Sequence, residues 1–261
     1  MAKLMGVVNV TPDSFSDGGL YLDPEAAIAH GRELAAAGAE ILDVGGESTR
    51  PGAEAVSAEE ELRRVVPVIR GLSDIDCDVS VDTSKARVAE AALDAGAAIV
   101  NDVTALRGDP EMAGLCAERG ATVVLMHMLG DPRTMQDDPR YGDVVAEVKA
   151  FLARRLEAAV AAGIAEERVW LDPGIGFGKT AADNMELLRR LGELRELGRP
   201  LVIGTSRKSF IGRVDGSDAA HRLGGTIASS VLAAAEGAEV LRVHDVAEMR
   251  QALTVATAIL G

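Results

Sequence analysis

An alternation that recurs eight times constrains the fold most: a short apolar, strand-like run ends in a polar residue, and a helical segment usually follows. The runs lie at 4–9, 40–44, 79–82, 98–102, 123–127, 169–172, 200–208 and 239–244. Apolar strands separated by helices are typical of parallel sheets. We therefore predict an α/β fold, a single-domain (β/α)8 TIM barrel over residues 1–261, since such barrels run to about 250 residues.

Helical periodicity is clear in eight segments between or after these runs. They are 24–37, 58–71, 84–95, 110–119, 142–162, 181–191, 221–236 and 245–260. Asp23, Ser57 and Ser84 stand at three of the starts and are residue types that cap helices. A doubly wound open sheet is the alternative, but such sheets rarely carry candidate site residues at the ends of all eight strands. In a barrel these ends share one face, and we expect the site there.

The charge balance limits the partners of this chain. It has 41 acidic and 27 basic residues, which gives a formal net charge of −14. Such a surface repels polyanions, so we expect no nucleic-acid partner. Two cysteines without a CxxC motif favour a reducing compartment. The first residues show no signal-peptide pattern and no apolar stretch is long enough to cross a bilayer, so we expect a cytoplasmic protein without a membrane partner.

Three strand-like runs end in side chains that accept hydrogen bonds: Asp82, Asn101 and Asp172. Carboxylates in an enclosed site are costly unless they are paired or hydrogen-bonded. Each residue could instead cap the helix that follows, and Asp82 before Thr83 and Ser84 suits that role. Three such residues at one barrel mouth favour a ligand that presents a row of N–H donors.

Basic side chains gather at the last two strand ends. Arg207 and Lys208 occupy a strand-to-helix turn, which favours an anion site or the stabilisation of an electrophile, with a solvated basic turn as the alternative. Arg242 and His244 alternate with Val243, so they point the same way. Two adjacent strand ends could therefore hold an anionic small molecule.

The remaining histidines show no comparable pattern. We expect His30 and His221 on helix surfaces. His127 follows the fifth strand but has no evident partner in the sequence, so we expect it at the rim of the barrel. Ser-His-Asp hydrolysis is disfavoured because no nucleophile elbow is recognisable.

Oxygen ligands for a hard cation are available near the first two strands, from Asn9, Asp13, Asp17 and Asp43. Magnesium is usually held by one or two such ligands together with substrate phosphate. No set of His and Cys residues suggests a transition metal. We therefore expect Mg²⁺ as the cofactor.

Two loops and one glycine-rich run are unusual. The loops 11–22 and 45–56 are longer than the usual connection of about two to six residues and favour a lid or binding role. The run LDPGIGFGKT at 171–180 lacks the first glycine of a Walker A motif, because Pro173 stands there. It meets a relaxed dinucleotide pattern, but in the sixth βα unit, where an NAD domain would not normally begin. We therefore expect the glycines of this run to let the backbone approach a flat ligand closely.

Eight motifs, taken in order, resemble those of the dihydropteroate synthase family. They are MGVVNVTPDSFSDGG, DVGGESTRPGA, VSVDTSK, IVNDV, LMHM, LDPGIGFGKT, GTSRKSFIG and RVHDV. The ordered set is far more specific than any single motif. The resemblance implies an enzyme of folate biosynthesis and a sulfonamide target. It would condense 6-hydroxymethyl-7,8-dihydropterin diphosphate with 4-aminobenzoate, with diphosphate leaving before the amine attacks.

The resemblance also implies a role for each matching residue. The catalytic set would be Asp17, Asp82, Asp172, Lys208 and Arg242. Pterin contacts would come from Asp82, Asn101, Val103, Met126, Asp172, Phe177 and Lys208. Aminobenzoate contacts would come from Phe15, Thr49, Arg50, Pro51 and Ser209. Arg242 and His244 would contact diphosphate, Asn9 would contact Mg²⁺, and Ser16 and Asp43 would also bind substrate. The resemblance further suggests a homodimer through helices of the C-terminal half.

Two alternatives remain open. A non-catalytic paralogue that only binds pterin should have lost loop residues, yet TPDSFSDGG and STRPG are intact. A pterin-binding methyltransferase domain of the corrinoid-dependent kind would need no diphosphate site. Arg50, Lys208, Arg242 and His244 together disfavour that reading.

Overall fold

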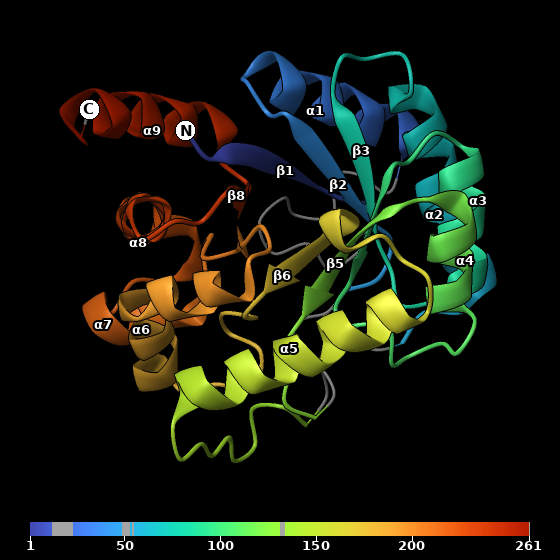
Figure 1. Cartoon of the computed structure of the whole chain (residues 1–261). Coiled ribbons are helices and arrows are strands. Elements are labelled where there is room, and N and C mark those ends of the chain that lie inside the picture. Colours follow the sequence, from blue (N-terminus) through green and yellow to red (C-terminus); the bar gives the residue numbers. More distant parts are fainter. Residues whose placement is uncertain (12–22, 49–52, 54, 131–133, 261) are drawn as a thin grey trace.

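The computed structural model describes residues 1–11, 23–48, 53, 55–130 and 134–260, and eight parallel strands form one sheet within them (Figure 1). The strands are β1 (Lys3–Asn9), β2 (Ile41–Gly45), β3 (Asp78–Asp82), β4 (Ile99–Asp102), β5 (Thr122–Met126), β6 (Val169–Asp172), β7 (Val202–Ile203) and β8 (Val240–Val243). Their order is β6-β5-β4-β3-β2-β1-β8-β7. A parallel bridge between Leu171 and Leu201 joins the two edges. The predicted barrel is therefore confirmed as a nearly closed one.

Helices surround this barrel and follow the strands in the predicted alternation (Figure 1). They are α1 (Pro24–Ala36), α2 (Ala58–Leu72), α3 (Ala86–Asp94), α4 (Met112–Arg119), α5 (Val144–Ala161), α6 (Ala181–Arg189), α7 (Ser209–Asp215), α8 (Leu223–Ala235) and α9 (Val246–Leu260). The short 3-10 turns are η1 (Glu166–Arg168), η2 (Leu191–Leu197) and η3 (Ala219–His221). All eight predicted segments contain an α-helix. Among the described helices, none has the length and apolar character needed to span a membrane.

Two of the three predicted helix caps are confirmed. The side chain of Asp23 accepts a hydrogen bond from the backbone of Glu25 at the start of α1, and Ser57 accepts one from Glu60 at the start of α2. The cap predicted at Ser84 is wrong. The first backbone N–H of α3 donates instead to Oδ2 of Asp109, 2.9 Å away, so the cap comes from the loop after β4.

The seventh βα unit differs most from the prediction. The strand predicted over 200–208 is only two residues long, because the chain turns after β7 and residue 207 adopts a left-handed conformation with φ of 57°. The short helix α7 then follows, which the periodicity did not predict. His221 lies in the short 3-10 helix η3 just before α8, and its side chain is exposed as expected.

Side chains of alternate residues along the strands explain where the site lies. Inside the barrel, an apolar floor is formed by Met5, Ile41, Ile99, Val124, Val202 and Val240, with Trp170 packed against it. Two residues further along the strands, the same faces carry Asp43, Asn101, Asp172 and Arg242. Because successive residues of a strand point to opposite faces, these polar side chains also point inward. A polar layer therefore stands on an apolar floor at the carboxyl ends of the strands.

Candidate active site

Four side chains from four strands form one ionic network in the polar layer. Arg242 donates from Nε to Oδ2 of Asp43 across 2.6 Å and from Nη2 to Oδ2 of Asp82 across 3.0 Å. Asn101 donates from Nδ2 to the same Oδ2 of Asp43 across 3.1 Å. Of the three residues predicted to converge, Asp82 and Asn101 meet in this network through Asp43 and Arg242, while Asp172 makes no hydrogen bond to it within the described part of the chain. Asp82 does not serve as the cap of α3, which was the alternative.

Asp43 lies deepest in this network. It is fully buried, and its Oδ1 atom has no hydrogen-bond partner among the described residues. Its Oδ2 atom receives both Arg242 and Asn101. A side chain enclosed in this way orients its two neighbours, Arg242 and Asn101, and its contact with substrate stays a prediction.

Burial sets the protonation of the carboxyls in the layer. Burial, followed by the charge of Asp43, raises the pKa of Asp82 to about 7, and Arg242 opposes this effect. Burial also raises the pKa of Asp172, while the backbone N–H of Gly174 and the charge of Lys208 lower it. Burial opposes the charge of Arg242, but the two carboxylates Asp43 and Asp82 raise its pKa. Perturbed carboxyls around one guanidinium are typical of functional sites.

An apolar wall stands beside the polar layer. It consists of Val103, Met126, Met128 and Met135, with Phe177 packed against them. The predicted wall residues Val103, Met126 and Phe177 therefore lie together, and the sequence analysis missed the two other methionines. Register places Met126 opposite Asp172, so the wall begins directly beside a carboxylate.

Lys208 crosses from the turn after β7 toward this wall. Its Nζ lies 4.1 Å from the centre of the Phe177 ring, a cation–π arrangement. A side chain on Gly176 would meet Cδ of Lys208 at 3.1 Å, and this glycine has a φ of +85°. The glycine-rich run thus lets the backbone pass close to the lysine, and its approach to a flat ligand stays a prediction.

The two adjacent cations after β7 diverge. Arg207 donates to both carboxylate oxygens of Asp245, from Nη2 at 2.5 Å and from Nε at 3.1 Å. It therefore holds the start of the segment after β8, and the prediction that Arg207 and Lys208 serve one anion site is wrong. His244 accepts or donates a hydrogen bond at Nδ1 with Oγ of Ser206, 2.9 Å away, which orients its imidazole.

The predicted rim position of His127 is wrong. The residue is buried, its ring meets the edge of Phe151, and its Nδ1 lies 2.9 Å from Nζ of Lys179. Lys179 is itself a buried lysine that the sequence analysis did not select. Its only sequence signal is a basic residue within the glycine-rich run after β6.

A second ion cluster, in which one carboxylate is fully buried, supports the loop after β2. Lys85 pairs with Glu47 and, at 2.6 Å, with Glu61 of α2, which is fully buried. Glu47 also accepts a hydrogen bond from the backbone of Val56 at 3.1 Å. The cluster therefore fixes the described ends of the segment that carries Thr49, Arg50 and Pro51.

Oxygen atoms of two strand ends face a common space. A carbon atom added to Gly45 of β2 would lie 3.9 Å from Oδ2 of Asp82 and 4.0 Å from Oδ1 of Asn9. Gly45 has no side chain, so this space stays open. Among the residues that the structure describes, no three of His, Cys, Asp or Glu come together as a metal site.

Several predicted site residues lie outside the described part of the chain. They are Phe15, Ser16, Asp17, Thr49, Arg50 and Pro51, together with Asp13 as a candidate ligand. Ser209 is described, and it is exposed at the first position of α7, directly after Lys208.

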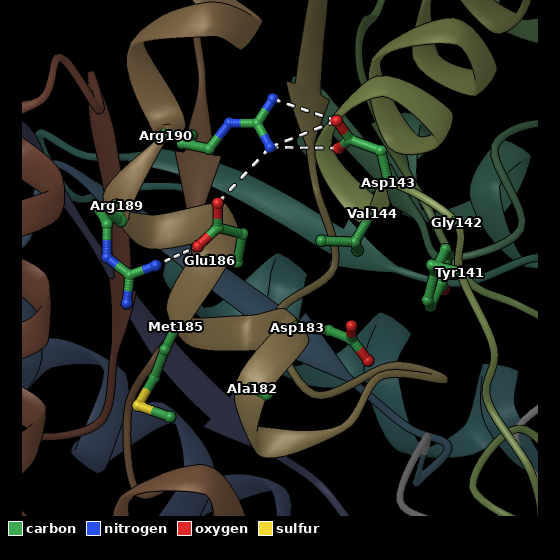
Figure 2. A pocket seen from close by; sticks show the side chains of 10 residues that line it. All are labelled: Tyr141, Gly142, Asp143, Val144, Ala182, Asp183, Met185, Glu186, Arg189 and Arg190. Carbon is green, nitrogen blue, oxygen red and sulfur yellow. Dashed lines mark hydrogen bonds and ion pairs between the residues drawn. The ribbon is translucent and has the colours of Figure 1, made fainter.

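A separate pocket of about 440 Å³ lies between the start of α5 and the length of α6 (Figure 2). Arg190 lines it and donates to Asp143 at 3.2 Å and to Glu186 at 3.4 Å. None of the predicted site residues lines this pocket. Its wall residue Tyr141 donates to the carbonyl oxygen of Gly178, so the pocket borders the outer side of the loop after β6.

Comparisons with known proteins agree with this architecture. The family model described as pterin binding enzyme matches residues 5–244. The dihydropteroate synthase of Synechocystis is 46% identical over 258 residues, which cover 98% of this chain and 89% of that protein. The Yersinia pestis dihydropteroate synthase, solved as a sulfonamide drug complex, has a TM-score of 0.97 and 45% identity, covering 99% and 94% of the two chains. The Xanthomonas albilineans dihydropteroate synthase in complex with 7,8-dihydropteroate has a TM-score of 0.89 and 49% identity, covering 100% and 94%.

Proposed function

Because the chain belongs to the pterin-binding enzyme family, we propose that it condenses 6-hydroxymethyl-7,8-dihydropterin diphosphate with 4-aminobenzoate, giving 7,8-dihydropteroate and diphosphate. The observation that carries this proposal is the network in which Arg242 pairs with Asp82 beside Asn101. It puts buried acceptors for a flat, donor-rich ring next to a cation for an anionic group. The family relatives named dihydropteroate synthase, one of them solved with 7,8-dihydropteroate, support the same reaction.

The polar layer and the apolar wall suit a pterin. The edge of the ring that carries N–H donors would face Asp82, Asn101 and Asp172, because buried carboxylates and amides require such donors. One face of the ring would lie against the wall that contains Met126 and Phe177. Lys208 would donate to acceptor atoms of the ring from beside Phe177.

Arg242 and His244 suit the diphosphate. A guanidinium has five N–H donors, and the two bonds described for Arg242 use two of them. Donors therefore remain for phosphate oxygens, which Arg binds well in planar geometry. His244, oriented by Ser206, would contact the same group.

We propose that Mg²⁺ binds beside Asn9. The oxygens of Asn9 and Asp82 face the opening above Gly45, and Mg²⁺ usually takes one or two protein oxygens while phosphates and water supply the rest. Asn9 would hold the ion together with the diphosphate. When bound, the ion neutralises charge on the leaving group.

The residues of the site account for the reaction in two stages. The bond from the pterin methylene carbon to the diphosphate oxygen breaks first, and its electron pair leaves with the diphosphate, whose charge Arg242 and His244 stabilise. The pterin cation that remains faces the carboxylates of Asp82 and Asp172, which stabilise it by charge. The amine of aminobenzoate then forms the new bond with its lone pair and releases a proton to solvent. Asp17 would add a further carboxylate, but it lies outside the described residues.

The aminobenzoate would enter at the mouth of the barrel beside the exposed Ser209. The roles proposed for Phe15, Ser16, Thr49, Arg50 and Pro51 rest on the motif resemblance, since the structure does not describe these residues.

We also propose a homodimer formed by α8 and α9. Large apolar side chains are exposed on both helices, at Leu232 of α8 and at Val255, Ile259 and Leu260 of α9. An exposed apolar patch of this kind marks an interaction surface. A cytoplasmic location is supported by Cys77 and Cys116, which are both free thiols, the state that a reducing compartment maintains.

An assay of diphosphate release tests the function. Release should require the pterin diphosphate, 4-aminobenzoate and Mg²⁺ together, and dihydropteroate should form in equal amount. Release with the pterin substrate alone would identify a hydrolase. Binding of pterin without turnover would identify a non-catalytic paralogue, and equal affinity for a pterin that lacks diphosphate would favour the methyltransferase reading.

A further inference from the structure

Lys179 is a buried cation that the proposed reaction does not use. The residue is only 3% exposed, and its Nζ lies 2.9 Å from each of three acceptors, Nδ1 of His127 and the carbonyl oxygens of Gly174 and Phe177, with the carbonyl oxygen of His127 further away at 3.4 Å. An ammonium group has three N–H donors. The three contacts can therefore satisfy all of them, which offsets the cost of burying the charge.

These contacts join two strand ends. His127 follows β5, while Gly174 and Phe177 belong to the loop between β6 and α6. Each loop residue is directly linked to a group of the proposed pterin site. The backbone N–H of Gly174 donates to Oδ1 of Asp172 at 2.7 Å, and the ring of Phe177 lies under Nζ of Lys208. Lys179 thus hydrogen-bonds directly to Gly174, which contacts Asp172, and to Phe177, whose ring contacts Lys208.

The loop has little room to adopt another position. A side chain on Gly174, whose φ is +68°, would come within 1.9 Å of the carbonyl oxygen of His127, so the two strand-end segments are in close contact. On the outer side, Tyr141 donates to the carbonyl of Gly178 and Gln136 to that of Gly176, each at 2.7 Å. Lys179 supplies the corresponding hydrogen bonds on the inner side.

Burial and the charge of Lys179 favour the neutral form of the His127 imidazole. Burial, and then the charge of Lys179, lower the pKa of His127 to about 3, so its Nδ1 can accept a hydrogen bond at neutral pH. Burial lowers the pKa of Lys179 to about 7; Asp172 and Asp183 oppose this shift, and Lys208 adds to it. If the amine loses its proton, the other imidazole tautomer donates from Nδ1 to the amine, and the two carbonyl bonds remain. The same three contacts therefore hold in both protonation states.

We propose that Lys179 and His127 form a positioning pair that holds the loop between β6 and α6, so that Asp172 and Phe177 face the pterin in the orientation the reaction needs. In this arrangement both side chains act through the loop and not on the substrate itself. The inference rests on the proposed function, because it names the pterin as the ligand that the loop positions.

Substitution of Lys179 tests the pair, with a second lysine as the control. Lys179→Met keeps most of the volume but removes every hydrogen bond of the ammonium group. Pterin diphosphate should then bind about 10- to 100-fold more weakly, since small misplacements of site groups cost up to about 100-fold, while the KM for 4-aminobenzoate should not change. Lys149→Met removes a lysine of α5 that pairs with Glu196, remote from the site, and should alter neither constant. A folded Lys179→Met variant with unchanged pterin affinity, or with equal losses for both substrates, overturns the proposal.

A pair of variants at His127 keeps the proposal testable if Lys179→Met does not fold. His127→Asn retains a hydrogen-bonding group near the position of Nδ1 and should restore most of the pterin affinity that His127→Leu loses. Equal affinities for pterin diphosphate in the two variants would refute the positioning role. Nitrogen NMR gives a readout without substrate: the imidazole of His127 should stay neutral through the range in which ordinary histidines titrate. Failure of the proposed function would appear differently, as a wild-type protein that neither binds nor converts the pterin diphosphate.

Discussion

Nη2 of Arg242 donates to Oδ2 of Asp82 over 3.0 Å, although the two residues are 160 positions apart in the chain. The same guanidinium holds Asp43 through Nε. One side chain of β8 therefore orients carboxylates on β2 and β3 before any ligand arrives. It also joins the proposed pterin site to the proposed diphosphate site, and several measurable consequences depend on this link.

Asp82→Ala should abolish the binding of pterin diphosphate, because it removes a buried acceptor for the N–H edge of the ring. A hydrogen bond to a charged group contributes about 1.5–3 kcal/mol, so two lost bonds weaken binding by more than about 100-fold. Isothermal titration calorimetry measures the loss, and Asp82→Asn serves as the matched variant that keeps the shape of the side chain. Unchanged affinity in Asp82→Ala would show that the pterin binds elsewhere.

The affinity for the pterin should depend on pH. Because burial and Asp43 raise the pKa of Asp82 to about 7, from an ordinary value of 3.8, its carboxylate gains a proton as the pH falls through about 7. The protonated group accepts N–H donors poorly, so affinity should decline on the acid side. Between pH 3.8 and about 7 the folded state holds this proton and the unfolded state does not. This group therefore lowers the free energy of unfolding of the free protein as the pH rises through that range. Calorimetry and thermal unfolding across the interval test both trends, and neither should persist in Asp82→Asn.

Arg242→Ala should chiefly weaken the contact with diphosphate. We expect a loss of about 10- to 100-fold for pterin diphosphate, in line with about 1.5–3 kcal/mol for a charged hydrogen bond, and a much smaller loss for the pterin without diphosphate. The variant also leaves Asp43 and Asp82 buried without their cation, so its melting temperature should fall. Arg242→Lys retains the charge and should recover most of the stability. A larger loss for the plain pterin than for the diphosphate would reverse the assignment.

Lys85→Met should destabilise the fold by about 3–5 kcal/mol, because it leaves the fully buried Glu61 without its cation. Arg87→Met is the matched control, since Arg87 pairs with Glu59 on the surface and both side chains are more than half exposed. Urea unfolding of the two variants should therefore differ clearly. Equal stability of the two variants would show that the cluster at the loop after β2 does not stabilise the fold.

Ile259→Glu should dissociate the proposed dimer, because a charge in the centre of an apolar contact must be desolvated. Val160→Glu on α5, which lies on another side of the barrel, adds the same charge at an exposed apolar position and should leave the mass unchanged. Analytical ultracentrifugation distinguishes the two. A monomeric wild-type protein would contradict the proposal outright.

Much of the site could be predicted because it follows from local rules. Runs of β-branched residues that end in polar ones predicted the strands, and a period of two predicted that Arg242 and His244 share a face. A parallel barrel collects its strand ends at one face, so Asp82, Asn101 and Asp172 could be grouped without knowing any distance. The order of the motifs then indicated the family, which the comparisons confirm.

What could not be predicted depended on contacts between distant segments. His127 had no partner in its own stretch of sequence, because its partner Lys179 comes from the next βα unit. Arg207 looked like a companion of Lys208, but its left-handed backbone turns it toward Asp245. The cap of α3 came from Asp109, 23 positions away, in place of the local Ser84.

The sequence by itself determined the class of fold, the face that holds the site and the family, because hydrophobic periodicity and ordered motifs are local properties of the chain. The tertiary structure alone decided which charges meet. Closing the barrel brings Arg242 to within hydrogen-bonding distance of Asp43, 199 positions away, and buries Asp43 completely. Inside the barrel a charge must find a partner or be neutralised, and the geometry of the closed sheet, which no local pattern encodes, selects that partner.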